Sequence, residues 1–485
     1  MSNTIFQLEP KLIWEQFANL NAVPRPSKNE EKVIAFMMNF GNNLGFETFK
    51  DEVGNVIIRK PATPGFVNRK MITLQSHLDM VHQKNADTEF DFDTQGIQMF
   101  VEGDWVKAKG TTLGADNGLG VATIMALLKS NDIPHPPLEA LFTIDEETGM
   151  TGAFGLKGGI LKGDILLNLD TEEDDEIDIG CAGGIDVTAK RHYNEKSSVH
   201  GDIGFEIKVK GLKGGHSGIE IHKGLGNANK IMNRLLYTGS KYNMRVGALQ
   251  GGGLRNAIPR ESWCKVNLDK THEVAFLEQF GLVAEDIKKE LKVMEPNLSI
   301  IIAPSKPSKR VMGLGAQEKL VKSIYAAHNG VYAMSASIPD LVETSNNIAR
   351  VQVKEGEILI NCLTRSAVET AKMDLANALK STFELAGFEV EFKGFYPGWS
   401  PNPDSEILRI TKGIYKDLFK EEPKVVACHA GLECGILGQY YPNMDMVSFG
   451  PTILGAHSPD ERVSISSVQK FWKFLLKILK ETPVK

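Results

Sequence analysis

The hydrophobic residues of this chain are spaced in two different ways. Up to residue 186, and again from residue 396, short apolar runs typical of buried strands alternate with segments whose apolar residues recur every three or four positions, as in amphipathic helices. Between residues 187 and 395, apolar and polar residues alternate one by one, as in FEIKVK at 205–210, which indicates antiparallel strands with one solvated face. We therefore predict one domain built from segments 1–186 and 396–485, with a second, α+β domain of residues 187–395 inserted into it.

The order of elements predicts the fold of the outer domain. Because strands and helices alternate there, we expect an α/β fold with a doubly wound, mostly parallel sheet. The clearest strands are expected at 71–75, 138–144, 165–169 and 446–449, and a helix at 406–419. Ser27, followed three residues later by Glu30, indicates a capping box at the start of an early helix.

The inserted domain contains a possible internal repeat. Asn256-Ala257-Ile258-Pro259 precedes one predicted strand, and the similar Asn346-Asn347-Ile348-Ala349 precedes another. This echo predicts a domain made of two similar halves.

Acidic and histidine side chains follow the predicted strands of the outer domain. His77 ends the strand at 71–75, the pair Glu146-Glu147 follows 138–144, and Asp170 follows 165–169. In doubly wound sheets, functional sites lie beyond the carboxyl ends of the strands. We therefore expect these side chains to lie close together.

A glycine-rich turn, GTTLGADNGLG at 110–120, precedes a predicted helix and contains Asp116. It matches neither common phosphate-binding motif and offers no lysine to a phosphate. Because Asp116 would repel an anion, a turn that holds this carboxylate toward a cation is the better interpretation.

The candidate residues suit a metal centre. Two imidazoles and three carboxylates fit two zinc-like ions that share one ligand, with Asp116 as the natural bridge. The candidate ligands are His77, Asp116, Glu147, Asp170 and His457. Glu146, next to Glu147, is then available as a general base, and Asp79 faces the same side as His77 and can orient its ring. Each of the five candidate ligands by itself is better explained as surface charge or a helix cap, and the metal centre is favoured because all five fall on strand-end loops.

Composition removes several other classes of protein. The net charge of −6 argues against a nucleic-acid binder, and no apolar run is long enough to span a membrane. The start of the chain lacks the pattern of a signal peptide. Five widely spaced cysteines without a C-x-x-C pair indicate reduced thiols and a cytoplasmic location. Any metal must therefore be held by histidines and carboxylates, and motifs of serine or cysteine hydrolases are absent.

Six motifs, in this order along the chain, resemble one enzyme family. They are SHLDMV, TTLGADNGLG, DEETGMTGA, NLDTEE, GGHSG and GAHSPDERV. The resemblance is to the co-catalytic di-zinc peptidase family that includes aminoacylase, peptidase T and carboxypeptidase G. SHLDMVHQK, LNLDTEEDDEIDIGCAGG and HAGLECGIL are similar to its aminoacyl-histidine dipeptidase branch.

The resemblance implies roles for individual residues. His77 and Asp170 would hold one zinc, and Glu147 and His457 the other. Asp116 would bridge the ions, with a cis peptide bond before Asn117. Asp79 would orient His77, and Glu146 would act as general base on water.

The resemblance also implies residues for the substrate. His216 of GGHSG would stabilise the oxyanion, from its own subunit or from a partner, and Asn256 would contact the substrate. The arginine that often binds the substrate carboxylate in this family is replaced here by the VNLDK segment, so Arg365 is the candidate for that role.

Together these features predict a cytoplasmic metallopeptidase. We expect two Zn²⁺ per subunit, with Mn²⁺ or Co²⁺ as substitutes, and hydrolysis of unblocked dipeptides, preferentially Xaa-His such as β-alanyl-histidine. The inserted domain would act as a lid and as the interface of a homodimer, and neither nucleic acid nor membrane is expected as a partner. An N-acyl amino acid deacylase or tripeptidase of the same architecture is the nearest alternative, and a non-catalytic metal- or peptide-binding protein is the alternative of another class.

Overall fold

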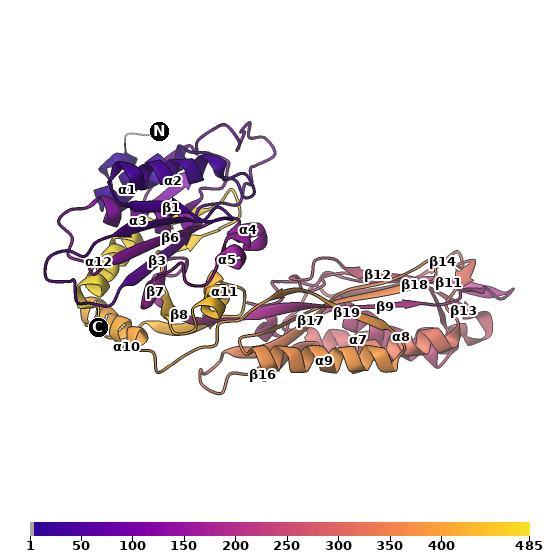
Figure 1. Cartoon of the computed structure of the whole chain (residues 1–485). Coiled ribbons are helices and arrows are strands. Elements are labelled where there is room, and N and C mark those ends of the chain that lie inside the picture. Colours follow the sequence, from indigo (N-terminus) through magenta and orange to yellow (C-terminus); the bar gives the residue numbers. More distant parts are fainter. Residues whose placement is uncertain (1–3) are drawn as a thin grey trace. The chain divides into compact units, whose positions relative to one another are not determined.

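The chain folds into two units, each with its own sheet (Figure 1). The structure is a computed structural model and describes residues 4–485. The first unit comprises residues up to Gly180, Trp399–Ala427 and Leu432–Lys485, and the second comprises Cys181–Gly398 together with Cys428–Gly431. The sequence-based boundaries were residues 186 and 395, and the sequence did not predict that residues 428–431 group with the second unit.

An eight-stranded sheet forms the centre of the first unit. Its strands, in spatial order, are β1 (Glu47–Lys50), β2 (Val56–Lys60), β6 (Leu138–Thr143), β3 (Ile72–His77), β7 (Ile165–Asn168), β21 (Asp445–Ser448), β8 (Glu176–Cys181) and β20 (Lys424–Cys428). The four central strands β6, β3, β7 and β21 are parallel to one another, β1 and β2 form an antiparallel edge next to β6, and β8 pairs antiparallel with β21. Strands β3, β6 and β7 are buried along their whole length, as strands covered on both faces must be. The predicted α/β fold with a mostly parallel sheet is therefore confirmed.

Helices surround this sheet (Figure 1). They are α1 (Lys11–Asn21), α2 (Glu31–Asn43), α3 (Ala115–Lys129), α4 (Glu146–Gly149), α5 (Thr151–Gly155), α10 (Glu406–Phe419), α11 (Glu433–Tyr440) and α12 (Ile465–Glu481). Leu437 of α11 and Ala153 of α5 pack in one buried cluster with Leu141 of β6 and Leu166 of β7. A small second sheet contains β22 (Ile453–Leu454), β23 (Arg462–Ser464), β5 (Trp105–Ala108) and β4 (Met99–Glu102).

The predicted capping box at Ser27 is wrong. Helix α2 begins at Glu31, and Glu30 caps it without a side-chain hydrogen bond. The Ser27 hydroxyl donates instead to Asp79 Oδ2 at 2.8 Å, and Glu30 Oε1 accepts from the amide of Lys28 at 2.7 Å. A tertiary partner 52 residues away in the sequence has replaced the local cap.

The second unit contains a nine-stranded sheet. Its main path runs β14 (Ser299–Ser305), β11 (Asp202–Lys210), β13 (Ser262–Asp269), β12 (Arg245–Gly252), β17 (Val342–Lys354), β18 (Glu357–Ser366), β9 (Gly183–His192) and β19 (Glu389–Tyr396), with β16 (Gly330–Met334) beside β17. Its helices are α6 (Ala228–Ser240), α7 (Glu273–Leu291), α8 (Leu314–Ala326) and α9 (Glu369–Leu385), and β10 (Lys196–Ser197) pairs with β15 (Arg310–Val311). One continuous apolar core joins the sheet to the helices.

This sheet has the same arrangement on both sides of the β12–β17 pair. The run β11-α6-β12-β13-α7-β14 fills one half, and β9-α8-β17-β18-α9-β19 repeats that order in the other, with antiparallel pairing between corresponding strands. The first run is inserted between β9 and α8 of the second. The sequence echo does not coincide with this repeat, because Asn256 lies in the β12–β13 connection whereas Asn346 lies inside β17.

Two further expectations can be compared with the described residues. Within residues 4–485 none of the five cysteines forms a disulfide, in agreement with the predicted reduced thiols. No helix of the part described here is long and apolar enough to cross a membrane.

Candidate functional site

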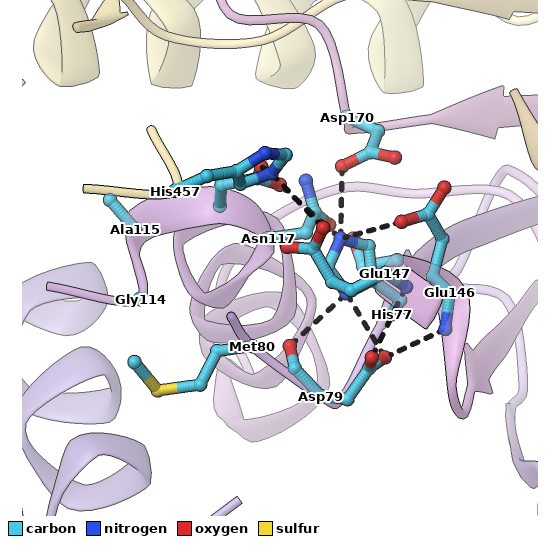
Figure 2. A network of polar contacts seen from close by, with 12 residues as sticks. His77, Asp79, Met80, Gly114, Ala115, Asn117, Glu146, Glu147, Asp170 and His457 are labelled. Carbon is cyan, nitrogen blue, oxygen red and sulfur yellow. Dashed lines mark hydrogen bonds and ion pairs between the residues drawn. The ribbon is translucent and has the colours of Figure 1, made fainter. Parts of the chain in front are cut away.

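The strand ends of the first unit bring the predicted acidic and histidine residues together (Figure 2). His77 is the last residue of β3, Glu146 and Glu147 open α4 after β6, and Asp170 follows β7. Asp116 lies at the start of α3, and His457 comes from the loop between β22 and β23. The peptide bond between Asp116 and Asn117 is cis, as predicted.

Asp116 is shared by two groups of potential ligands. One of its carboxylate oxygens, Oδ1, lies 3.2 Å from His77 Nε2, and the other, Oδ2, lies 3.2 Å from His457 Nε2. His77, Asp116 and Asp170 offer ligand atoms within 4.8 Å of one another, and so do Asp116, Glu147 and His457. A carboxylate with one oxygen in each group has the arrangement of a bridging ligand.

The charges and unpaired atoms of this cluster fit metal ions. Glu147 Oε1 and Asp170 Oδ1 are buried and form no hydrogen bond. Hydrogen bonds to Asp116 and Glu147 raise the pKa of His457 to about 11. Burial lowers the pKa of His77, but Asp170 and Asp116 raise it well above its usual range. The carboxylates therefore attract positive charge strongly, and the mixed imidazole and carboxylate donors suit zinc, manganese or cobalt.

Asp79 links the His77 ring to the loop after β6. Its Oδ1 lies 3.3 Å from His77 Nδ1 and accepts the amide of Glu146 at 3.0 Å, while Oδ2 accepts the amide of Glu147 at 3.3 Å. The His77 Nδ1 also lies 3.1 Å from the Asp79 carbonyl oxygen. These contacts direct Nε2 toward Asp116 and Asp170, as an outer-sphere carboxylate does at a metal site.

Glu146 lies at the edge of the same cluster. Its Oε2 is 4.0 Å from His77 Nε2. Burial raises the pKa of Glu146 well above its usual range, and the nearby Asp170 and Glu433 raise it further while His77 opposes them. A carboxyl with a raised pKa suits a group that takes up and returns a proton near neutral pH.

Two residues that the sequence analysis did not select hold the ligand-bearing loops. Glu461 accepts four consecutive backbone amides, those of residues 113–116, at 2.7–3.2 Å. The buried guanidinium of Arg25 donates to the carbonyl oxygens of Leu78, Asp79 and Gly114. The sequence offered only weak signals that could have identified these two residues. Glu461 lies four residues after His457, and Arg25 lies between two prolines.

The second unit contains the three remaining candidates. His216 Nδ1 accepts the amides of Gly218 and Ile219 at 3.2 and 3.1 Å, so the ring proton of the neutral imidazole lies on Nε2. Burial, reinforced by the charge of Arg365, lowers the pKa of His216 to about 4. His216 is therefore a neutral donor through Nε2. Asn256 is exposed, and its carbonyl oxygen accepts the Ser217 amide at 2.8 Å.

Arg365 is a buried cation without a carboxylate partner. Its side chain donates to the Tyr396 hydroxyl at 2.6 Å, its Nε forms no hydrogen bond, and within residues 4–485 it forms no ion pair. His429, which the sequence analysis did not select, lies in this region with Nε2 2.8 Å from Ser345 Oγ. Burial and the positive charge of Arg365 lower the pKa of His429 to about 3.

Comparisons with known proteins agree with this arrangement. Residues 73–481 match the model described as Peptidase family M20/M25/M40. The cytosol non-specific dipeptidase of Escherichia coli (strain K12) is 43% identical over 480 residues, which cover 99% of each chain. The crystal structure of aminoacylhistidine dipeptidase from Vibrio alginolyticus has a TM-score of 0.94 and 44% identity over 100% of both chains.

A more distant structure shares the fold. Aminopeptidase PepT from Bacillus cereus has a TM-score of 0.58 and 16% identity, covering 98% of this chain and 99% of that one. The family match extends over most of the chain and includes all the strand-end residues described above. The chain therefore belongs to the M20/M25/M40 family of metallopeptidases.

Proposed function

We propose that this metallopeptidase is a dipeptidase that holds two Zn²⁺ ions per subunit. His77 and Asp170 would bind one ion, Glu147 and His457 the other, and Asp116 both. The observation that carries the proposal is the position of Asp116, whose two oxygens face the two groups of ligands. Mn²⁺ and Co²⁺ are expected to substitute, because the same donors suit them.

The protein's own residues supply the proton transfers. The bound ions would act as Lewis acids and make water more acidic. Glu146 would accept a proton from water at its carboxylate and deliver it to the leaving amine. Asp79 keeps Glu146 in place through its amide and His77 through its ring.

Three residues of the second unit are proposed to bind the peptide substrate. His216 would donate its Nε2–H to the carbonyl oxygen on which negative charge develops. Arg365, buried without a carboxylate partner, would bind the C-terminal carboxylate of the substrate, and Asn256 would contact the peptide.

Two relatives support dipeptides as substrates. The Escherichia coli relative is named a non-specific dipeptidase and the Vibrio alginolyticus protein an aminoacylhistidine dipeptidase, and each is matched over 99% or more of its length. We therefore expect unblocked dipeptides, with Xaa-His such as β-alanyl-histidine preferred.

We also propose that the protein is cytoplasmic and that it forms a homodimer. The Escherichia coli relative is named a cytosolic protein. The rings of Tyr237 and Tyr325 in the second unit are tilted against each other with centroids 5.0 Å apart, and both side chains remain about half exposed, which suits a surface that is covered by a second copy. Sedimentation analysis of the full chain should give twice the mass of the 53.4 kDa monomer.

Hydrolysis of a small substrate panel tests the enzymatic proposal. Metal-stripped protein, with and without added Zn²⁺, would be given β-alanyl-histidine, Gly-His, Gly-Leu, Gly-Gly-Leu and N-acetyl-histidine. Zinc-restored cleavage of the dipeptides, fastest for those ending in histidine, is expected.

The other outcomes separate the alternatives. Cleavage of N-acetyl-histidine alone would identify a deacylase, and cleavage of Gly-Gly-Leu alone a tripeptidase of the same architecture. Zinc binding without cleavage of any substrate would favour a non-catalytic binding protein.

A further inference from the structure

A fully buried glutamate lies behind the metal-ligand candidates. Glu433 is the first residue of α11, and its side chain is 0% exposed. Its Oε2 accepts Gln75 Nε2 and Thr143 Oγ1, both at 2.6 Å, while Oε1 has no hydrogen-bond partner. Within residues 4–485 it forms no ion pair, so only the more distant charge of His77 offsets part of the cost of burying a carboxyl group. Burial raises the pKa of Glu433 to about 8.

The two partners of Glu433 stand directly before the metal-ligand candidates. Gln75 precedes His77 by two residues on β3, so both side chains point to the same face of the sheet. Thr143 ends β6, three residues before Glu146 and four before Glu147. Glu433 therefore joins, through side chains, the ends of the two strands that carry His77 and the glutamate pair.

The same hydrogen-bonded chain extends to a third ligand candidate. Asn168 Nδ2 donates to Gln75 Oε1, and the Ser448 hydroxyl donates to Asn168 Oδ1. Thr171 Oγ1 lies 2.8 Å from Ser448 Oγ and donates to Asp178 Oδ2 at 2.8 Å. Asn168 and Thr171 flank Asp170, and every member of the chain is buried.

We propose that Glu433 is a positioning residue of the metal centre. Acting through Gln75 and Thr143, it keeps the carboxyl ends of β3 and β6 at the spacing at which His77 and the Glu146–Glu147 pair converge. The assignment rests on the proposed metal site. Outer-sphere groups of this kind typically change metal affinity by about 10- to 100-fold when they are removed.

Glu139 provides a matched control on the same two strands. It is also 0% exposed and lies on β6, but near the opposite end. It accepts Thr73 Oγ1 of β3 at 3.0 Å and forms an ion pair with Arg59 at 2.9 Å. If buried carboxyls between β3 and β6 acted only on folding, Glu433 and Glu139 would give the same phenotype.

The experiment compares Glu433→Met with Glu139→Met in the full chain, because methionine has a similar length but no oxygen that accepts the hydrogen bonds. Zinc stoichiometry and dissociation constants would be measured by competition with a chelator, and the melting temperature of the metal-free form by calorimetry. For Glu433→Met we expect zinc dissociation constants raised about tenfold or more. For Glu139→Met we expect a lower melting temperature with zinc affinity unchanged.

Several outcomes would overturn the assignment. Zinc affinity of Glu433→Met equal to that of the wild type, or an equal loss in Glu139→Met, would reduce Glu433 to a structural role. If Glu433→Met fails to fold, Thr143→Val decides, because it removes one donor to Glu433 while conserving side-chain shape; unchanged zinc affinity there rejects the assignment. A wild-type chain that binds no zinc would instead contradict the proposed function itself.

Discussion

The two units contain buried charge of opposite sign. In the first, Asp116, Glu147 and Asp170 converge with Glu146 nearby, and two of the carboxylate oxygens form no hydrogen bond. In the second, Arg365 is buried beside the neutral His216 and His429 without any ion pair in the described range. Since an unpaired buried charge is costly, each unit is suited to a ligand of the opposite charge.

This difference is the one that the proposed metal centre and the proposed carboxylate site require. In the first unit, neighbouring carboxylates raise the pKa of His77 and His457, and this cluster therefore suits cations. In the second unit, burial and Arg365 lower the pKa of His216 and His429, and this region therefore suits an anion such as a peptide carboxylate. The two pairs of histidines therefore have pKa values that are shifted in opposite directions.

The largest effect is expected from Asp116→Ala. Because Asp116 faces both groups of ligands, its loss should empty both metal positions and abolish peptide hydrolysis. Metal analysis of the dialysed protein measures this directly, with Glu52→Ala, an exposed glutamate of the same unit, as the control. Two fully occupied ions in Asp116→Ala would exclude the bridging role.

Glu146→Ala should separate binding from chemistry. We expect kcat to fall by about 10²- to 10⁴-fold, because a general base contributes on this order, while both metals remain bound. Steady-state kinetics and metal analysis on one preparation give the two quantities. Loss of metal together with activity would show that the roles of Glu146 and Glu147 are reversed.

Arg365→Met should affect the substrate carboxylate specifically. Removal of a charged hydrogen-bond donor is expected to raise KM for Gly-His by about 10- to 100-fold, with little effect on its C-terminal amide. For Arg365→Lys, which keeps the charge, the KM for Gly-His should lie between the values of the wild type and of Arg365→Met. Equal losses on both substrates would place the carboxylate elsewhere.

The smallest effect is expected on the pH dependence of the free energy of unfolding, through His429 of the second unit. His429 has a pKa of about 3 in the folded chain and about 6.5 when unfolded, so the unfolded state binds more protons between these values. The free energy of unfolding should therefore fall as pH falls below 6.5, by about 1.4 kcal/mol per pH unit for one such group. Thermal unfolding of His429→Gln between pH 7 and 5 should show a shallower dependence, and identical slopes would contradict the linkage.

Sequence patterns predicted the residues whose signals are local. His77 and Asp170 follow apolar runs, and Asp116 stands among glycines before a helix, so their places at strand and helix ends could be predicted. Glu461, Arg25 and Glu433 were missed because their partners are backbone groups or side chains far away in the sequence. Ser27 is a further example: the local sequence pattern predicted a helix cap, but the Ser27 hydroxyl donates its hydrogen bond to the distant Asp79 instead.

The architecture of the second unit was predicted only in outline. The alternation at 205–210 predicted antiparallel strands, and β11 is one. The repeated order of elements was less visible, because β9 of the second half is separated from α8 by the whole first half. Residues 428–431 likewise join this unit through tertiary contacts that no local pattern records.

The β12–β17 pair at the middle of the repeated sheet has a consequence for self-association. Either half by itself would expose one of these strands as an unpaired edge, a common starting point for aggregation. Joined in one chain, the halves cover each other's edge, and the outer strands that remain are poor templates. β19 presents Glu389, Glu391 and Lys393, and β14 contains Pro304. A second copy of the chain would then associate through side-chain surfaces, and strand addition would be disfavoured.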